Sequence, residues 1–515
     1  MRGFVWLTVL VLLCGLLSAT ASFAQSKAIV VFEEEIRSGQ YTGDIDIGAQ
    51  AIDADGKGLW EGGTQSADVS TSKYFERAPV AIPDGSGGAI VAFEMEAREG
   101  EYVGDCEIGV QRISSTGKQL WNGGERSLVV ASSKWSEKRP VIISDGAGGA
   151  IVVYEAHALT GQFVGDVDVL AQRISPDGKL MWNDAERSSF VASGKYAERM
   201  VAAIPDGLGG AIIVFEMEAR EGEYAGDCEI GAQRISADGK VLWGTAEQPI
   251  MVASSKWSEK RPTLVSDGAG GAIVIFEAYA LSGEYAGDID IRAQRISGDG
   301  KLLWNGGERS SAVSSGKNAE RAPVAIPDGL GGAIVAFETE AREGEYVGDS
   351  EIAAQRISSD GNLLWNSGES STLVASSKWS EKRPALISDG SGGAIIVFDA
   401  YALSGEFEGD VDVRAQRISG DGKLLWNAGE KSNAVASGKY AERRVSVIPD
   451  GSSGAIVAFE MEAREGEYVG DSEIGAQRIS ADGNLLWNGG DRSTTVASSK
   501  MTERAPVIIP TVSYR

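Results

Sequence analysis

The sequence predicts an all-β fold, an eight-bladed β-propeller with four antiparallel strands in each 61-residue blade. Three observations lead to this prediction. The alanine of a Gly-Gly-Ala-Ile-Val-x-Phe-Glu segment recurs every 61 residues, at Ala28, Ala89, Ala150, Ala211, Ala272, Ala333, Ala394 and Ala455. Each repeat holds short β-branched runs between Asp-Gly turns. The chain also ends with a first strand, Arg504–Pro510, that has no second strand after it. A closed ring uses this C-terminal strand to complete the first blade.

Four strands are expected in each repeat, and the third repeat illustrates them. They are Arg139–Ser144, Ala150–Glu155, Val167–Ser175 and Lys179–Trp182. Asp-Gly turns connect the first strand to the second and the third to the fourth, because aspartate and glycine suit tight turns. A longer loop joins the second strand to the third, and a polar linker leads to the next repeat. The first strand is expected to lie nearest the axis, and the long loops and linkers to share one face of the ring.

An alternation between odd and even repeats tests ring closure. Even repeats read Met-Glu-Ala-Arg-Glu-Gly-Glu-Tyr, as at Met95–Tyr102, and odd repeats read Ala-Tyr-Ala-Leu-Ser-Gly-Glu, as at Ala278–Glu284. The C-terminal Ser498–Met501 has the odd form and would join the odd first repeat. Alternation therefore continues across the junction if the number of blades is even. An open solenoid is the alternative, but it would need distinct terminal capping repeats.

The N-terminus reads as a secretory signal over residues 1–24. It has a positive start at Arg2, an apolar core at Val5–Leu17 and a small-residue cleavage site at Ser22–Ala24. Residues 25–515 then form a single propeller domain, secreted or periplasmic. No second apolar stretch suggests membrane insertion.

The net charge of −26 disfavours nucleic acid as a partner, since phosphate binding needs an excess of lysine and arginine. The same charge favours a soluble protein, and we expect a monomer.

The repeat Pro-Asp-Gly-x-Gly-Gly-Ala-Ile-Val-x-Phe-Glu … Ala-Gln-Arg-Ile-Ser-x-Asp-Gly-x-Leu-Leu-Trp resembles the repeats of secreted bacterial propellers, most of which have no assigned function. This resemblance covers Lys27–Pro510. The segment Ala293–Trp304 is also similar to the tryptophan-docking repeat of quinoprotein-type propellers, although the unit here is longer. The first resemblance implies a secreted propeller. The second agrees with eight blades, since quinoprotein-type propellers are often eight-bladed.

A lysine followed by an aromatic residue recurs just before the first strand and is the candidate ligand site. The residues are Lys73, Tyr74, Lys134, Trp135, Lys195, Tyr196, Lys256, Trp257, Lys378, Trp379, Lys439 and Tyr440. A glutamate follows three positions after each lysine. Aromatic faces stack on sugar rings and charged groups bond hydroxyls, so this pattern suits a glycan. The alternative is structural, with the aromatic residues filling seams between blades and the charges paired locally.

Paired acids in the long loops are a second candidate site. The odd repeats carry Asp44, Asp46, Asp166, Asp168, Asp288, Asp290, Asp410 and Asp412. Carboxylates two residues apart in a loop could share a calcium ion, although the full calcium-loop pattern is absent. We otherwise expect no cofactor.

Two further repeated residues suggest structural roles. The tryptophan that ends the predicted fourth strand, as at Trp182, is expected to wedge between blades. The arginine of the Gln-Arg pair, as at Arg112, is expected to pair with the acid that ends the second strand, such as Glu94. The first repeat has Ala51 in place of this arginine.

These patterns favour a secreted non-enzymatic binding or scaffold protein that presents its long-loop face to an extracellular glycan or protein. The single histidine, His157, cannot build a Ser-His-Asp triad or a multi-histidine metal site by itself. Two alternatives stay open. One is a propeller enzyme, quinone-dependent or polysaccharide-cleaving, and the other is a calcium-loaded structural protein.

Overall fold

The structure is a computed structural model of the 515-residue chain. It describes residues 27–37, 42–63, 65–98, 103–124, 126–131, 133, 135–160, 164–185, 188–220, 225–282, 286–316, 318–342, 347–368, 370–404, 408–429, 432–438, 440–464, 469–490, 493–498 and 501–511. The predicted signal peptide, residues 1–24, lies outside the described residues. Within them, no helix is long and apolar enough to cross a membrane.

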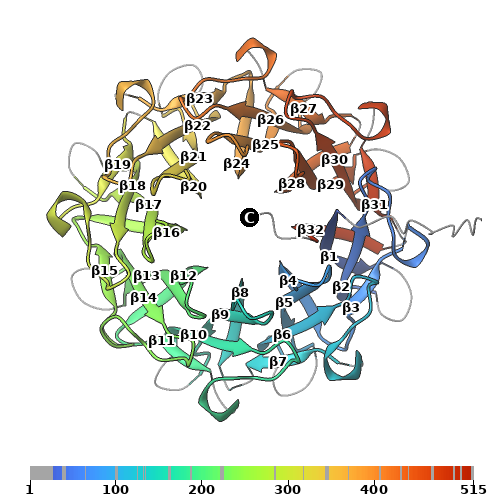
Figure 1. Cartoon of the computed structure of the whole chain (residues 1–515), viewed down its shortest axis with the longest axis horizontal. Helices are drawn as coiled ribbons and strands as arrows, with labels where there is room; N and C mark the ends of the chain where they lie inside the picture. Colours follow the sequence, from blue (N-terminus) through green and yellow to red (C-terminus); the bar gives the residue numbers. More distant parts are fainter. Residues whose placement is uncertain are drawn as a thin grey trace, which may run out of the picture.

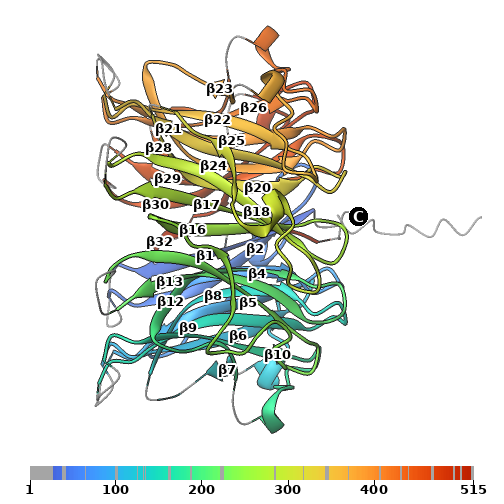
Figure 2. The same cartoon turned by 90° about the vertical axis from the view of Figure 1, so that its left-hand side faces the viewer.

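Eight four-stranded antiparallel sheets form the blades of a ring, which confirms the predicted propeller (Figure 1). From the side, the strands run between the two rims of a thick disc (Figure 2). We number the blades 1 to 8 in the order of their second strands. The first strand of each meander lies nearest the axis, as predicted.

The inner strands of blades 2 to 8 and then 1 are β4 (Phe75–Pro83), β8 (Ser136–Ser144), β12 (Tyr196–Pro205), β16 (Trp257–Ser266), β20 (Ala319–Pro327), β24 (Trp379–Ser388), β28 (Tyr440–Pro449) and β32 (Met501–Pro510). The second strands of blades 1 to 8 are β1 (Ala28–Ile36), β5 (Ala89–Glu96), β9 (Ala150–His157), β13 (Ala211–Ala219), β17 (Ala272–Ala280), β21 (Ala333–Glu340), β25 (Ala394–Ala402) and β29 (Ala455–Ala463).

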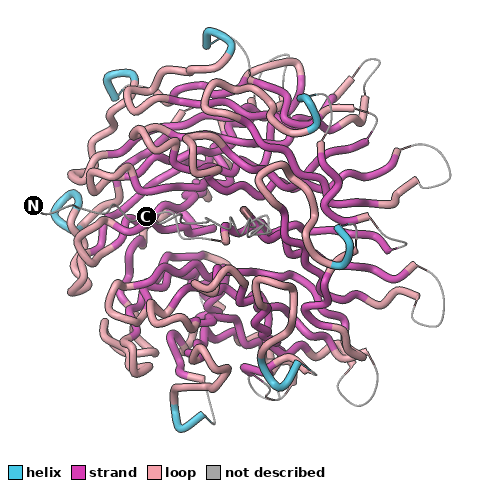
Figure 3. Tube along the Cα trace, turned by 45° about the vertical axis from the view of Figure 1, so that its right-hand side comes forward, coloured by secondary structure: helices cyan, strands magenta, loops and turns pink. Residues whose placement is uncertain are grey.

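The third strands of blades 1 to 8 are β2 (Ile45–Ile52), β6 (Cys106–Ile113), β10 (Val167–Ile174), β14 (Cys228–Ile235), β18 (Ile289–Ile296), β22 (Ser350–Ile357), β26 (Val411–Ile418) and β30 (Ser472–Ile479). The outer strands are β3 (Ala67–Ser70), β7 (Leu128–Ala131), β11 (Ser189–Ala192), β15 (Ile250–Ala253), β19 (Ser311–Ser314), β23 (Thr372–Ala375), β27 (Asn433–Ala436) and β31 (Thr494–Ala497). Short 3-10 turns lie around the outer edge (Figure 3); they are η1 (Glu61–Gly63), η2 (Trp121–Gly124), η4 (Asn183–Ala185), η5 (Trp304–Gly307), η6 (Asn366–Gly368), η7 (Asn427–Gly429) and η8 (Asn488–Gly490).

The second strand of each blade is the centre of the core. In blade 5, Ile273, Val274, Ile275 and Phe276 are all fully buried, although successive side chains point to opposite faces of the sheet. Each face packs against a neighbouring blade, so a strand that is apolar on both sides is covered on both sides.

The ring closes through the C-terminal strand, as predicted. β32 pairs antiparallel with β1, with Ile509 opposite Ile29 and Thr502 opposite Glu35. Ile508 and Ile509 are buried in the clusters on either side of blade 1. The last strand of the chain therefore supplies the innermost strand of the first blade.

The predicted position of the fourth strand is wrong. Lys179–Trp182 makes only an isolated bridge between Leu180 and Ile174, and the outer strand of blade 3 is Ser189–Ala192. The backbone leaves the sheet here because the Trp182 indole turns into the seam, where its Nε1–H donates to the Ala237 carbonyl of blade 4 at 2.9 Å. The linker before the next inner strand therefore shrinks to residues 193–195.

Every seam repeats this tryptophan contact, which confirms the predicted wedge role. Each indole Nε1–H donates to a backbone carbonyl of the following blade at 2.9 to 3.1 Å. The last one, from Trp487 to Ala54, crosses the closure from blade 8 to blade 1.

The arginine of the Gln-Arg pair has a different partner from the one predicted. Arg112 lies 2.9 Å from Asp84 of the first Asp-Gly turn, and its Nη1 donates to the Pro176 carbonyl of the next blade. Seven blades repeat the Arg–Asp pair at 2.8 to 2.9 Å. Glu94 lies at the opposite end of β5 from this turn, so Arg112 cannot serve it. Blade 1 has Ala51 and Thr511 at the two positions, so both charges are replaced together.

Candidate functional site

A ring of β-bulges lines the axis and explains what the acid at the end of each second strand does. Each inner strand carries one extra residue, and this residue has a positive φ between 50° and 57° although none is glycine. The eight residues are Ala78, Arg139, Met200, Arg261, Ala322, Arg383, Arg444 and Ala505. Each of their N–H groups donates to a carboxylate of the preceding blade at 2.6 to 3.1 Å. Glu94, for example, accepts from Arg139 at 2.8 Å.

The predicted Lys-aromatic pairs lie at the start of the inner strands. Where they are described, the lysines are exposed and the aromatic residues are half-buried; Lys134 and Lys439 lie outside the described residues. Tyr74, Tyr196 and Tyr440 pack against the apolar clusters between blades. The Nζ atoms of Lys73 and Lys195 lie 5.4 and 4.9 Å from the ring centres of Tyr74 and Tyr196. The tyrosines of even blades therefore fill seams.

In blades 3, 5 and 7, a serine links the backbone N–H of the tryptophan to a buried glutamate. The Trp257 N–H donates to Ser255 Oγ at 3.0 Å, and Ser255 donates to Glu259 Oε1 at 2.6 Å. Serine bonds readily to the backbone two residues on, so a short turn forms without regular structure. Blade 7 repeats the contact in Ser377, Trp379 and Glu381 at 3.1 and 2.6 Å.

Lys256 and Trp257 line a pocket of about 540 Å³ in the seam between blades 4 and 5. We call it the seam pocket. Glu259, Arg292 and Glu308 line it as well. Arg309 lines it too, so the pocket brings together an aromatic ring, three cations and two carboxyl groups. Ligand pockets of this size are common in proteins.

Glu259 is 2% exposed and is one of the residues that line the pocket. Its Oε2 has no hydrogen-bond partner among the described residues. The pKa of the Glu259 carboxyl is raised to about 7, mainly by burial and also by the Glu229 and Asp227 carboxylates, while Ser255 and Arg292 act in the opposite direction. A carboxyl with a pKa near neutrality can both give and take a proton.

An arginine fits at the position of Arg292 only where the neighbouring residue on the adjacent strand is small. In blade 4, a Cβ added to Gly231 would lie 2.6 Å from Met217 Sδ, so nothing larger than glycine fits. In blade 5 the corresponding residues are Arg292 and Ala278, and the small alanine leaves room for the arginine. Arg292 donates to Ser310 Oγ at 2.8 Å and to its carbonyl at 2.7 Å.

Blade 7 repeats part of this set, and residue 430, the counterpart of Glu308, lies outside the described residues. Arg414 donates to Ser432 Oγ and its carbonyl at 2.9 Å, and Lys378, Trp379 and Glu381 take the other places. Burial raises the pKa of the Glu381 carboxyl to about 7. Blade 3 has Leu170 at the arginine position, so its Trp135 lacks this cation.

Sequence reasoning found the lysines and tryptophans of this site but missed Arg292 and Arg414. A signal was present, because only these two repeats have arginine where the others have glycine, alanine or leucine. Glu308 lies in the 3-10 turn region, which was predicted as part of a linker.

The paired acids of the odd blades lie at the seams toward the even blades. In each pair, an arginine of the next blade holds the first aspartate, with Arg98–Asp44, Arg220–Asp166, Arg342–Asp288 and Arg464–Asp410 at 2.7 to 3.1 Å. The second aspartates, Asp46, Asp168, Asp290 and Asp412, are buried, and burial raises their pKa values. Among the described residues, no group of three or more acidic, histidine or cysteine residues has the arrangement of a metal site. Calcium binding at these positions stays a prediction.

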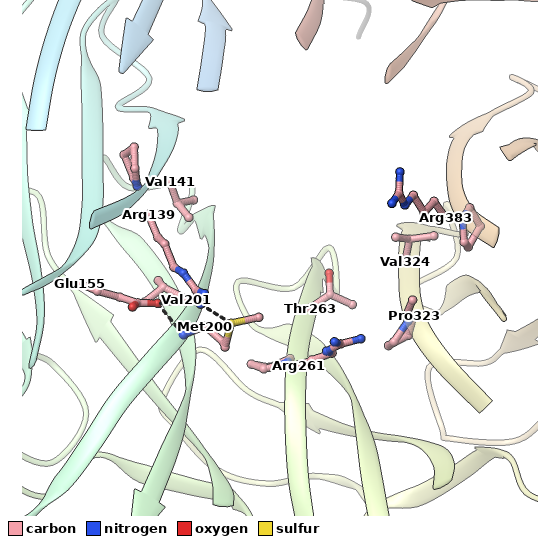
Figure 4. Close-up of a pocket in the computed structure, with 14 residues that line it drawn as sticks. Arg139, Val141, Glu155, Met200, Val201, Arg261, Thr263, Pro323, Val324 and Arg383 are labelled. Carbon is pink, nitrogen blue, oxygen red and sulfur yellow. Dashed lines mark hydrogen bonds and ion pairs between the residues drawn. The ribbon is translucent and has the colours of Figure 1, made fainter. Parts of the chain in front are cut away.

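A second hollow, of about 470 Å³, lies along the inner wall from blade 3 to blade 7 (Figure 4). We call it the axial hollow. The bulge residues Arg139, Met200, Arg261 and Arg383 line it, together with prolines and valines of the same strands. Glu155 also lines it and lies 2.9 Å from His157, the single histidine.

No protein-family model matches the chain, and no curated protein matches it. Among solved structures, a PL25 ulvan lyase bound to -[GlcA(1-4)Rha3S]- aligns with 81% of this chain and 97% of its own, at 12% identity and a TM-score of 0.44. The β-propeller domain of the trilobed protease of Pyrococcus furiosus aligns over 82% and 99%, at 10% identity and a TM-score of 0.43. An α-L-arabinanase of Cellvibrio cellulosa aligns over 57% and 94%, at 11% identity and a TM-score of 0.32.

The strand topology of the chain itself defines a β-propeller, and the likeness to these structures concerns the fold alone. The more specific resemblance to secreted bacterial repeat propellers and quinoprotein repeats stays a prediction. The preference for a non-enzymatic binding or scaffold protein is wrong against these neighbours, which are mostly enzymes that act on glycans. At such low identities they supply neither a substrate nor a mechanism for this chain.

Proposed function

We propose that the protein is an enzyme that cleaves glycosidic bonds in an extracellular polysaccharide, with its sites in the seam pocket of blade 5 and its counterpart in blade 7. The observation that carries the proposal is the seam pocket itself. It combines Trp257, Lys256 and Arg292 with Glu259, a buried carboxyl whose pKa lies near 7.

Substrate binding falls to the aromatic and basic side chains. The half-buried Trp257 offers an aromatic face on which a sugar ring can stack. Lys256 is exposed at the mouth and can bond hydroxyl groups. The Ser310 contacts hold Arg292 in one position, so its guanidinium costs little ordering when it binds a sugar oxygen.

Bond cleavage needs a proton donor and a second carboxylate. Glu259 donates its proton to the glycosidic oxygen as the bond to the anomeric carbon breaks. Glu308, exposed on the same pocket, takes a proton from water, and the resulting hydroxide adds to that carbon. Glycoside hydrolysis typically uses two carboxyl groups, one as the proton donor and one as the base. Glu308 then releases its proton to solvent, and solvent restores the proton on Glu259.

The test is release of reducing ends from a panel of neutral and uronate-containing polysaccharides. The native protein should release them, and E259Q/E381Q should lower kcat by about 100-fold or more, the usual contribution of a general acid. W257A/W379A should mainly raise KM.

Glu320→Gln is the matched control. Glu320 occupies the same strand position in blade 6 and is also buried with an unpartnered Oε2, but that blade has Asn318 and Ala353 in place of the tryptophan and arginine. Its activity should equal that of the native protein. The proposal is overturned if the native protein acts on no member of the panel, or if E320Q loses as much activity as E259Q/E381Q.

A further inference from the structure

Four arginines occupy the strained bulge positions on the inner wall. They are Arg139, Arg261, Arg383 and Arg444, and their side chains are 47% to 57% exposed. We propose that three of them, Arg139, Arg261 and Arg383, form a binding site in the axial hollow for a ligand that carries two or more carboxylates. This site is separate from the seam pockets and does not depend on the proposed function.

The three guanidinium groups contact the nearby carboxylates only at 3.6 to 3.7 Å, and Arg139 Nη1 also donates to Met200 Sδ at 2.6 Å. Arg261 Nη1 lies 3.7 Å from Glu277, beyond hydrogen-bonding distance, while Glu277 Oε1 accepts the Ala322 N–H at 2.6 Å. Arg139 and Arg383 lie at similar distances, 3.7 Å and 3.6 Å, from Glu155 and Asp399. The bulge hydrogen bonds thus hold the acids back while the guanidinium groups reach into the hollow.

The lining of the hollow carries more positive than negative side chains in a protein whose net charge is −26, although a carboxylate lies 3.6 to 3.7 Å from each arginine. Its charged residues are the three arginines and one acid, Glu155, whose side chain is 1% exposed and already bonded to the Met200 N–H and to His157. Prolines at 140, 262, 323 and 384 and neighbouring valines cover the wall between the arginines. Figure 4 shows the arginines distributed along this wall, not gathered at one point.

This arrangement points to the number and kind of charges on the ligand. Successive arginines lie two blades apart, so a single small anion would engage one of them and a ligand with several anionic groups would engage more. The planar guanidinium fork matches a carboxylate with two parallel hydrogen bonds. A low-dielectric apolar wall strengthens such bonds relative to water.

The backbone at the bulges tolerates alanine, so the arginines can be replaced to test the proposal. A positive φ is costly for most residues, but this chain places alanine at three of the eight bulges, Ala78, Ala322 and Ala505. The bulge hydrogen bond uses the backbone N–H, so R139A/R261A/R383A should keep the fold.

The experiment is isothermal titration calorimetry of the full mature chain with tri-galacturonate, with maltotriose as a neutral probe of equal length. Tri-galacturonate should bind with one site per chain, and maltotriose should not bind to this site. The triple alanine variant should bind at least 100-fold more weakly with an unchanged melting temperature. W257A/W379A should keep the single axial site, and any binding that this variant loses belongs to the seam pockets.

K179A/K301A/K423A controls for long-range charge. It removes the same number of positive charges from lysines on the rim turns, which are 76% to 77% exposed. The proposal is overturned if tri-galacturonate fails to bind the native chain, if binding survives in the arginine variant, or if the lysine variant loses as much affinity.

Discussion

The seams between blades and the inner wall around the axis differ in how much the repeats vary within one chain. At the seams, a tryptophan-to-carbonyl bond occurs in all eight blades and an Arg–Asp pair in seven. On the inner wall, the bulge residue is alanine, arginine or methionine. The difference has a physical cause, because each seam bond fixes the spacing of two blades, whereas a bulge is held through its backbone and leaves its side chain free to change.

Removal of the C-terminal strand β32, which closes the ring, should have the largest effect on stability. Truncation before Met501 deletes β32 and exposes the inner edge of β1 along its whole length. Buried Ile508 and Ile509 are lost with it. We expect the cooperative unfolding transition to disappear, since the loss is comparable to the whole stability of a typical domain, about 5 to 15 kcal/mol. Calorimetry checks this, and truncation after Thr511 is the control.

Removal of one seam arginine should have an intermediate effect. Arg295→Ala leaves the buried Asp267 without its ion pair and should lower the free energy of unfolding by about 3 kcal/mol. Denaturant unfolding measures this. R295A/D267N should recover part of the loss, because asparagine removes the unpaired charge and still accepts the turn N–H groups of Ala269 and Gly271. No recovery in the double variant would contradict the ion-pair explanation.

Titration of the inner-strand glutamates should have the smallest effect per residue on the free energy of unfolding. Burial raises the pKa values of Glu76, Glu137, Glu198, Glu259, Glu320, Glu381 and Glu442 to between about 7 and about 9. In the unfolded chain their pKa returns to the ordinary value near 4.5. The folded state therefore holds these protons more tightly, and stability should fall as the pH rises from about 5 to 9.

The melting temperature across this pH range tests that sign. Glu320→Gln should flatten the decline and raise the melting temperature at pH 9, because glutamine is neutral at every pH. A melting temperature that rises from pH 6 to pH 9 would show that these carboxyl groups are ionised in the fold at little cost.

Much of the fold was predictable because it depends on the local pattern of residues and on the constant length of the repeat. The sequence predicted the repeat period, the inner position of the first strand and the closure of the ring by Arg504–Pro510. The fourth strand did not, since Lys179–Trp182 has the composition of a strand and leaves the sheet only because the Trp182 indole finds a carbonyl in the next blade. Arg112 was assigned the wrong partner for the same reason, because Glu94 and Asp84 lie at opposite ends of their blade.

The candidate site was predictable in part. The repeated lysine and tryptophan drew attention to Lys256 and Trp257, and the pocket contains both. Arg292, Glu308 and the axial arginines come from other strands or from a bulge that no sequence pattern revealed. Their contribution depends on which residues neighbouring strands bring together, such as Ala278 leaving room for Arg292.

The sequence by itself determined the number of blades, the order of strands within them and the closure of the ring. These follow from the spacing of apolar runs and turns along the chain, which local backbone preferences and burial translate directly into strands. Only the tertiary structure decided which acid meets which base, because ion pairs and pockets form between segments about one repeat apart. The sizes of facing side chains at the seams and the hydrogen bonds of the bulges select these acid–base partners. Neither can be predicted from the sequence of one blade alone.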